Sequence, residues 1–166
     1  MVARRMPPAA GGAASKAAPQ GCTHLKLRQL GRVVARHYEA HVAPTGLRNT
    51  QYSLLSAVVK LGPMSLSDLA ASLRLDASTL TRNLQPLIDR GLVQVHTNEA
   101  DARSRIASAT AAGQALRTEA QRGWKRAQLA LNERLGPERV LALHALLDEA
   151  LAVLESEDDD VNEEPR

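Results

Sequence analysis

Residues 92–108 interrupt an otherwise helical sequence, and this interruption limits the folds that the chain can adopt. Apolar and polar residues alternate in 92–96, a turn-rich stretch follows, and 103–108 leads to Thr110. Alternation with a period of two residues predicts a strand, and two such runs around a polar tip predict a β-hairpin. On either side, apolar residues recur at helical spacing. The sequence therefore predicts helices around one small hairpin.

Composition favours a mainly α fold. Only 2% of the 166 residues are aromatic and there is no Phe, whereas there are 28 Ala and 25 Leu. Ala and Leu are strong helix formers, and the aromatic residues that favour strands are scarce. These numbers exclude a β-sandwich or a β-barrel.

The sequence also predicts the compartment. No apolar run approaches the roughly 20 residues of a membrane helix, and Arg4 and Arg5 are not followed by the apolar region of a secretory signal. The single cysteine, Cys22, cannot form a disulfide within the chain. We expect a cytoplasmic protein without a membrane partner.

Charge is concentrated at the two ends of the chain. Residues 1–36 carry seven basic side chains and no acid, and residues 155–166 carry seven acids and one arginine. The formal charge of +3 therefore divides into −6 on the last segment and +9 on residues 1–154. A body this basic favours polyanions such as nucleic acid or an acidic membrane surface, although an arginine-rich soluble protein gives the same charge.

Two short helices joined by a tight turn predict a helix-turn-helix. Ser65 or Ser67 caps the first helix, and the Asp76 carboxylate is placed to accept a backbone N–H at the start of the second. The second helix is expected to expose hydroxyl, amide and guanidinium side chains, which bond phosphates or base edges in a major groove. These residues are Ser78, Thr79, Thr81, Arg82 and Asn83. A small solvated helix in a bundle is the alternative.

A hairpin directly after such a helix predicts a wing. Arg103 and Arg105 lie at or just past its tip, and arginines at a wing enter a narrow, electronegative minor groove. Asp101 is expected to brace the wing, either by holding the neighbouring arginines or by stiffening the tip. Together with the basic body, this arrangement predicts binding to double-stranded DNA.

The first helix and the last two helices carry apolar stripes with no partner in this winged module. In the last helix the stripe runs from Val140 to Leu154 at the spacing of one helix face. A monomer would expose these stripes, so we expect a homodimer that buries them. The predicted fold is mainly α: a winged helix-turn-helix with a small β-hairpin wing and an α-helical dimerisation region built from the first and last helices.

The predicted organisation has five parts. They are a disordered N-terminal extension (1–21), a first dimerisation helix (22–48), a winged helix-turn-helix DNA-binding region (49–109), C-terminal dimerisation helices (110–155) and an acidic disordered tail (156–166).

Over about residues 22–155 the chain resembles the MarR (multiple antibiotic resistance regulator) family of transcription factors. The motifs are Gly46-Leu47 with Gln51, Ser67-Asp68-Leu69-Ala70, Ser78-Thr79-Leu80-Thr81-Arg82, Arg90-Gly91-Leu92-Val93, Asp101-x-Arg103-Ser104 and Thr110-x-x-Gly113. The resemblance implies a triangular homodimer, usually a repressor, on a pseudo-palindromic operator with half-sites roughly 34–36 Å apart. One departure is Pro86 inside the second helix of the motif, where we expect a kink.

The resemblance also implies a pocket between the dimerisation helices and the DNA-binding lobe. Small aromatic, phenolic or anionic effectors bind there in the family and weaken DNA binding. The polar and aromatic candidates in this chain are Arg28, His37, Tyr38, His41, Tyr52 and Trp124. An Arg or a His would meet an anionic effector, and each residue has interface packing or surface charge as its alternative role.

Two further features suggest other chemistry. Cys22 lies at the start of the first helix, where the helix dipole favours a thiolate, so an oxidant-sensing regulator is an alternative hypothesis. His37 and His41 lie one helical turn apart, but nothing completes a metal-ligand set, so we expect no metal. No catalytic or cofactor motif appears, so we expect neither an enzyme nor a cofactor. A weakly specific architectural DNA-binding protein is the remaining alternative.

Overall fold

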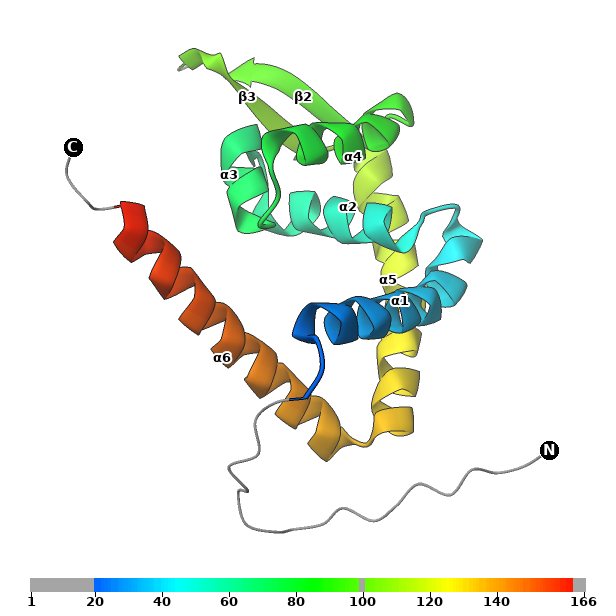
Figure 1. Ribbon diagram of the computed structural model, residues 1–166. Helices are drawn as coiled ribbons and strands as arrows, with labels where there is room; N and C mark the ends of the chain where they lie inside the picture. The colour runs from blue at the N-terminus through cyan, green and yellow to red at the C-terminus, as the bar shows by residue number, and fades with distance from the viewer. Residues whose placement is uncertain (1–19, 99–100, 163–166) are drawn as a thin grey trace.

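The computed structural model describes residues 20–98 and 101–162 (Figure 1). Most of the predicted N-terminal extension and the last residues of the predicted acidic tail lie outside these ranges. Within them, the fold is helical with one three-stranded antiparallel sheet, which confirms the predicted fold class. The helices are α1 (Thr23–Val42), η1 (Ala43–Thr45), α2 (Asn49–Leu61), α3 (Leu66–Ser72), α4 (Ala77–Asp89), α5 (Ala111–Leu135) and α6 (Pro137–Asn162), and the strands are β1 (Met64–Ser65), β2 (Val93–Asn98) and β3 (Asp101–Ala109).

The long helix α5 connects two parts of the molecule (Figure 1). At one end it joins a lobe formed by α2, α3, α4 and the sheet, and further along it is crossed by α1. After Gly136 the chain turns back, and α6 runs as a separate diagonal helix, drawn in orange and red. The lobe is the predicted winged helix-turn-helix.

Polar side chains start the helices where the sequence predicts. Ser65, Asp76 and Thr110 are the N-caps of α3, α4 and α5, and each accepts a backbone N–H from the residue three positions on, at 3.0, 2.7 and 3.1 Å. After α4 ends, Gly91 adopts a φ of +66°, the left-handed conformation that glycine adopts most easily. This turn leads the chain directly into β2.

The sheet contains one strand more than the predicted hairpin. The strand order is β1-β3-β2, with Met64 opposite Ala107 and Ser65 opposite Ile106. Because β1 has only two residues, no alternation could reveal it. It closes the open edge of β3, so the wing is attached to the lobe along its base.

The hydrophobic core fills the lobe between α2, α3, α4 and the sheet. Leucines and valines from all of these elements are almost fully excluded from solvent, and α5 covers one side through Ala120 and the half-buried Leu116 and Trp124. The largest fully buried side chains are Leu47, Leu55, Leu69, Leu80, Leu84, Leu87, Val42, Val58 and Val93.

Two glycines let α5 lie directly against backbone. A Cβ on Gly113 would stand 2.0 Å from the carbonyl oxygen of Leu92, and a Cβ on Gly123 would stand 2.3 Å from that of His41. The backbone N–H of Thr110 also donates to the Leu92 carbonyl at 3.1 Å. Helix α5 is therefore fixed to the lobe at one point and to α1 at another.

Apolar side chains on α1 and α6 are uncovered in the single protomer. Leu141 and Leu146 of α6 are 69% and 65% exposed, and Val33 of α1 is 56% exposed. Other exposed apolar residues on α1, α5 and α6 are Leu25, Leu27, Leu30, Leu129, Leu151, Val153 and Leu154. Leu30, Val33, Leu151 and Leu154 belong to the stripes for which the sequence predicts a second copy of the chain. Leu141 and Leu146 lie outside the predicted stripe of the last helix, and Val140 of that stripe is buried within the protomer.

The last helix extends beyond the point where the sequence predicts disorder. Helix α6 continues to Asn162, although we expected residues 156–166 to be without regular structure. The segment is acidic but contains no Gly or Pro before Pro165. Helix α6 therefore continues through 156–162 although this stretch contains three aspartates, which are weak helix formers.

The sequence predicts a kink at Pro86. Helix α4 continues as one α-helix through this proline, and its first turns lie ahead of it.

Among the helices of residues 20–98 and 101–162, none combines the length and the apolar character needed to span a membrane.

Candidate nucleic-acid interface and ligand pocket

The first turns of α4 present a polar surface. Four of the five residues predicted to contact DNA are exposed, and Thr79 is half-buried, whereas the leucines on the opposite face of the helix are buried. The exposed residues are Ser78, Thr81, Arg82 and Asn83. The structure therefore places all five predicted residues on one short helix, which is anchored from behind by the core.

The Asp76 carboxylate organises the start of this helix. It accepts the hydroxyl of Ser78 at 2.5 Å, the hydroxyl of Thr79 at 2.7 Å and the backbone N–H of Thr79 at 2.7 Å. The hydrogen bonds from Ser78 and Thr79 hold the pKa of the Asp76 carboxyl well below its usual range. The carboxylate is therefore ionised at neutral pH and acts only as an acceptor.

The remaining side chains of this face also have partners within the protein. The Thr81 hydroxyl donates to the carbonyl oxygen of Ala77 at 2.8 Å. Arg82 donates from Nη2 to the Thr79 hydroxyl oxygen at 3.3 Å, which links Arg82 to Asp76 through Thr79. The guanidinium is thereby placed over the first turn of α4.

The wing carries two exposed arginines at different depths. Arg103 lies near the tip, and its backbone N–H donates to the Asp101 carboxylate at 3.0 Å. Arg105 lies further down β3, opposite Thr97, and lines a small cavity with Thr81 and other side chains of α4. Arg105 is therefore nearer to α4 than the sequence suggested.

Sequence reasoning missed several polar residues beside the polar surface of α4. Gln85 shares the exposed face of α4 with Thr81 and Arg82, and helical spacing could have revealed it. At the start of α2, Arg48 and Gln51 line a shallow groove together with Arg82. This second group comes from a separate helix, and no local pattern in the sequence indicates that it lies close to α4.

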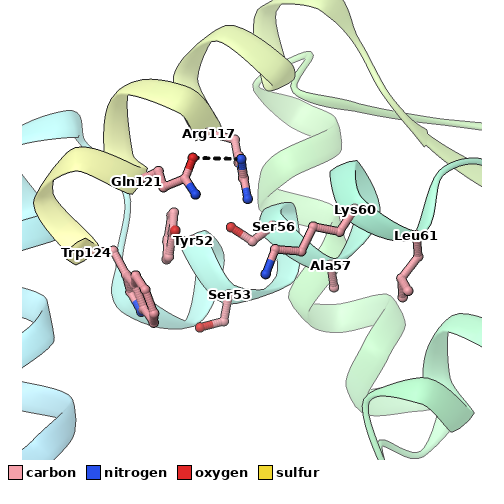
Figure 2. A pocket seen from close by; sticks show the side chains of 9 residues that line it. All are labelled: Tyr52, Ser53, Ser56, Ala57, Lys60, Leu61, Arg117, Gln121 and Trp124. Atoms are coloured by element: carbon pink, nitrogen blue, oxygen red, sulfur yellow. Dashed lines mark hydrogen bonds between the residues drawn. The ribbon is translucent and has the colours of Figure 1, made fainter. Parts of the chain in front are cut away.

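A cavity of about 350 Å³ lies between α2 and α5 (Figure 2). Tyr52 and Trp124 form part of its wall, with ring centroids 6.4 Å apart in a stacked arrangement. The other lining residues are Ser53, Ser56, Ala57, Lys60, Leu61, Arg117 and Gln121. Two cationic side chains therefore meet an aromatic wall in a cavity that opens to solvent.

Two residues that line this cavity each have a buried polar atom without a hydrogen-bond partner in the described residues. These atoms are the Ser56 hydroxyl oxygen and the Arg117 Nε. The other end of the Arg117 guanidinium donates to the Gln121 side-chain oxygen at 2.9 Å, as Figure 2 shows. Buried polar groups are normally hydrogen-bonded, and both atoms lie beneath the cavity surface, so a ligand contacts them only if neighbouring side chains move.

Of the six predicted effector residues, Tyr52 and Trp124 line the cavity and four do not. His37 contacts the carbonyl oxygen of Ala127 through Nε2 at 2.8 Å, and Tyr38 donates its hydroxyl to Gln128 at 2.5 Å. Both bonds join α1 to α5, and burial raises the pKa of the Tyr38 phenol.

The other two candidates lie elsewhere on α1. His41 bonds through Nδ1 to the carbonyl oxygen of His37, at 2.9 Å. Arg28 is exposed on the first half of α1. The cations at the cavity, Lys60 and Arg117, come instead from α2 and α5, which only the packing of these helices brings together.

The residues singled out for other chemistry are separate from this cavity. Cys22 is exposed at the N-cap of α1 and makes no side-chain capping bond. In the described part of the chain, no three His, Cys, Asp or Glu side chains are grouped as metal ligands would be.

Comparisons with known proteins agree with this geometry. The model of the MarR family matches residues 47–104. An uncharacterized HTH-type transcriptional regulator of Bacillus subtilis, YwoH, is 30% identical over 74 residues, and the match spans about half of that protein (54%) and 45% of this chain. The crystal structure of the Mycobacterium tuberculosis transcriptional regulator MosR in complex with DNA is similar over 80% of this chain and 98% of that chain, with 32% identity and a TM-score of 0.68.

The chain belongs to the MarR family. It is a DNA-binding transcriptional regulator of the winged helix-turn-helix type and not an enzyme. The transcriptional repressor CouR bound to a DNA duplex has the same fold, with 24% identity over 78% of this chain and 92% of that chain and a TM-score of 0.72. MarR from Escherichia coli with operator DNA also has this fold, with 22% identity over 77% of this chain and 95% of that chain and a TM-score of 0.69.

Proposed function

We propose that this MarR-family protein is a repressor that binds a pseudo-palindromic operator as a homodimer and leaves it when an anionic aromatic effector binds. The start of α4 enters the major groove, and the wing reaches the minor groove. The observation that carries the proposal is the exposed polar face of α4, held in place by Asp76 and flanked by a wing with two exposed arginines.

The assembly is supported by the uncovered apolar side chains of α1 and α6. A homodimer that packs these helices together removes them from water and places two copies of α4 on one side of the assembly. The operator then has two related half-sites, roughly 34–36 Å apart.

Binding is tested by selecting operator sequences from a library of random duplexes and measuring affinity by gel shift. Arg82→Ala is expected to weaken operator binding by about 1–3 kcal/mol and to relax the preference at one base position. Arg103→Ala and Arg105→Ala are expected to lower affinity for most sequences. Arg122→Ala, an exposed arginine of α5, is the matched control.

Two results would contradict this assignment. If Arg82→Ala selects the same sequences as the wild type, α4 does not read the bases. If the wild type prefers its best sequence by much less than about 10³-fold over random DNA, the protein is an architectural binder.

The effector site is the cavity between α2 and α5. Arg117 and Lys60 offer positive charge, while Tyr52 and Trp124 form a flat apolar wall. A carboxylate pairs best with a guanidinium, and a ring packs best on aromatic faces. An aromatic carboxylate therefore matches this cavity.

A thermal-shift screen with benzoate and its hydroxylated derivatives tests the effector site. The melting temperature is expected to rise with the concentration of a ligand that binds. Arg117→Met is expected to abolish the shift, and Arg122→Met to preserve it. A ligand that shifts both variants equally binds elsewhere.

A further inference from the structure

We infer that Ser78 and Thr81 contact DNA as hydrogen-bond acceptors, so that they read the exocyclic amino groups of adenine or cytosine and do not hold phosphates. The inference further assigns Asp76 as the residue that fixes the polarity of Ser78, and the backbone carbonyl of Ala77 as the group that fixes that of Thr81. It rests on the proposal that the start of α4 enters the major groove.

The argument begins with the protons of the hydroxyl groups. A serine or threonine hydroxyl carries one proton and two lone pairs. Ser78 gives its proton to Asp76 at 2.5 Å, and Thr81 gives its proton to the carbonyl oxygen of Ala77 at 2.8 Å. Both residues are exposed, so a group of the DNA can approach their remaining lone pairs. Only a donor on the DNA can bond to them.

The chemistry of DNA then restricts the partner. Phosphate oxygens carry no proton, and neither do the O6 and N7 atoms of guanine or the O4 atom of thymine. In the major groove the donors are the N6 amino group of adenine and the N4 amino group of cytosine. Ser78 and Thr81 are therefore suited to these two bases.

The Ser78 proton is held firmly because its acceptor is charged. Hydrogen bonds to an ionised carboxylate are roughly twice as strong as bonds between neutral groups. Asp76 has no proton of its own to exchange, since the hydrogen bonds from Ser78 and Thr79 keep it ionised. If the Ser78 hydroxyl turned toward a phosphate, it would leave the carboxylate with one bond fewer in a field of negative charge.

Thr79 has a different part in this network. Its hydroxyl donates to Asp76 and accepts from Arg82, and the side chain is half-buried. Thr79 is thus a positioning residue for the Arg82 guanidinium. The face of α4 therefore offers hydroxyl acceptors at Ser78 and Thr81 and charged donors at Arg82.

The test is selection from a random duplex library at fixed salt, with gel shifts on the best sequences. Thr81→Val keeps the shape of the side chain and removes the acceptor, and Ser78→Ala does the same at its position. In each variant the preference for adenine or cytosine at one base position is expected to fall about fivefold. This factor corresponds to the free energy of one neutral hydrogen bond. Affinity for random DNA is expected to stay unchanged.

Asp76→Gly tests the polarity at Ser78. Glycine is tolerated at an N-cap, so the fold is retained. The change removes the carboxylate oxygen that accepts the Ser78 proton, so this proton becomes free to donate to the DNA. The expected result is a shift of the base selected at the Ser78 position from adenine or cytosine toward guanine or thymine, together with tighter binding to all duplexes because a negative charge is lost. A role in capping alone would not change the selected base.

Three outcomes are distinct. A uniform loss of affinity for all sequences in Ser78→Ala and Thr81→Val would show phosphate contacts and overturn the inference. An altered preference in Arg82→Ala with none in the hydroxyl and Asp76 variants would also overturn it, while the reading role of α4 would stand. If Arg82→Ala is silent as well, the proposed reading surface is wrong.

Discussion

Arg74 and Glu155 lie 81 positions apart in the sequence and form a two-point ion pair between the turn before α4 and the last helix. The Arg74 Nε donates to one carboxylate oxygen, and its Nη2 donates to the other at 3.0 Å. The hydrogen bonds from Arg74 lower the pKa of Glu155, and the same contact raises the pKa of Arg74. The pair joins the far end of α6 to the helix-turn-helix.

We expect Glu155→Gln to leave thermal stability almost unchanged at physiological salt. The two side chains are 59% and 50% exposed, so water and ions screen their attraction. A small decrease in the melting temperature is expected only at low ionic strength. A large loss at physiological salt would show that the pair is a principal anchor of α6.

Gly123→Ala is expected to destabilise the protein by about 1–3 kcal/mol, because the added methyl group would overlap the carbonyl oxygen of His41. Urea unfolding measures this change. Gly31→Ala in α1 is the matched control, since its Cβ meets nothing within 4 Å. The control is expected to be neutral or to stabilise by up to about 1 kcal/mol through helix propensity. Equal effects of the two changes would contradict the close contact.

Asp76→Asn is expected to make the free energy of unfolding depend less steeply on pH at acidic pH. The folded state lowers the pKa of Asp76, so the native carboxylate stabilises the fold above the ordinary carboxyl pKa, near 4. This contribution is lost as the pH falls below that value. The difference in unfolding free energy between wild type and variant should therefore narrow from pH 5 toward pH 2. Asp148→Asn on α6 controls for the loss of one acid, and a constant difference would contradict the network.

Leu141→Glu with Leu146→Glu is expected to convert a dimer into a monomer, measured by light scattering during gel filtration. Both side chains are largely exposed in the single protomer, so the charges are tolerated there but not in a buried interface. Ala71→Glu, an exposed change on α3, is the control. If the double variant keeps the mass of the wild type, α6 does not form the interface.

Ser56→Ala is expected to raise the free energy of unfolding by about 1 kcal/mol, because it removes a buried hydroxyl without a partner. Urea unfolding measures the change, and Ser72→Ala, an exposed serine of α3 outside the cavity, serves as the comparison. A loss of stability would show that the Ser56 hydroxyl is bonded in the free protein.

The starts of the helices were predictable because capping chemistry is local. Asp76 and Thr110 each accept an N–H three residues away, and that spacing is visible in the chain itself. The exposed polar face of α4 also followed from helical periodicity. Strand β1 did not, since two residues have no pattern and only the register with β3 defines the strand.

The cavity between α2 and α5, in contrast, could not be predicted from local patterns in the sequence. Ser56 and Arg117 look like ordinary helical positions in the sequence, and only the packing of α2 against α5 turns them toward one space. Arg28 was chosen for its residue type and His37 for its place on the apolar face of the first helix, but neither feature indicates which element that helix packs against. His37 instead bonds to backbone in the contact between α1 and α5.

Gly113 lets α5 lie directly against the backbone of Leu92, so the helix and the lobe are in close contact at this point. Helix α5 has 25 residues and is therefore about 37 Å long. If the lobe and α5 turn as one body, a change of angle at the far end of the helix moves α4 by an amount that this length sets. Over that length a rotation of about 5° moves the end by about 3 Å, close to the rise of one base pair. A few degrees are therefore enough to shift α4 by one step along a DNA groove.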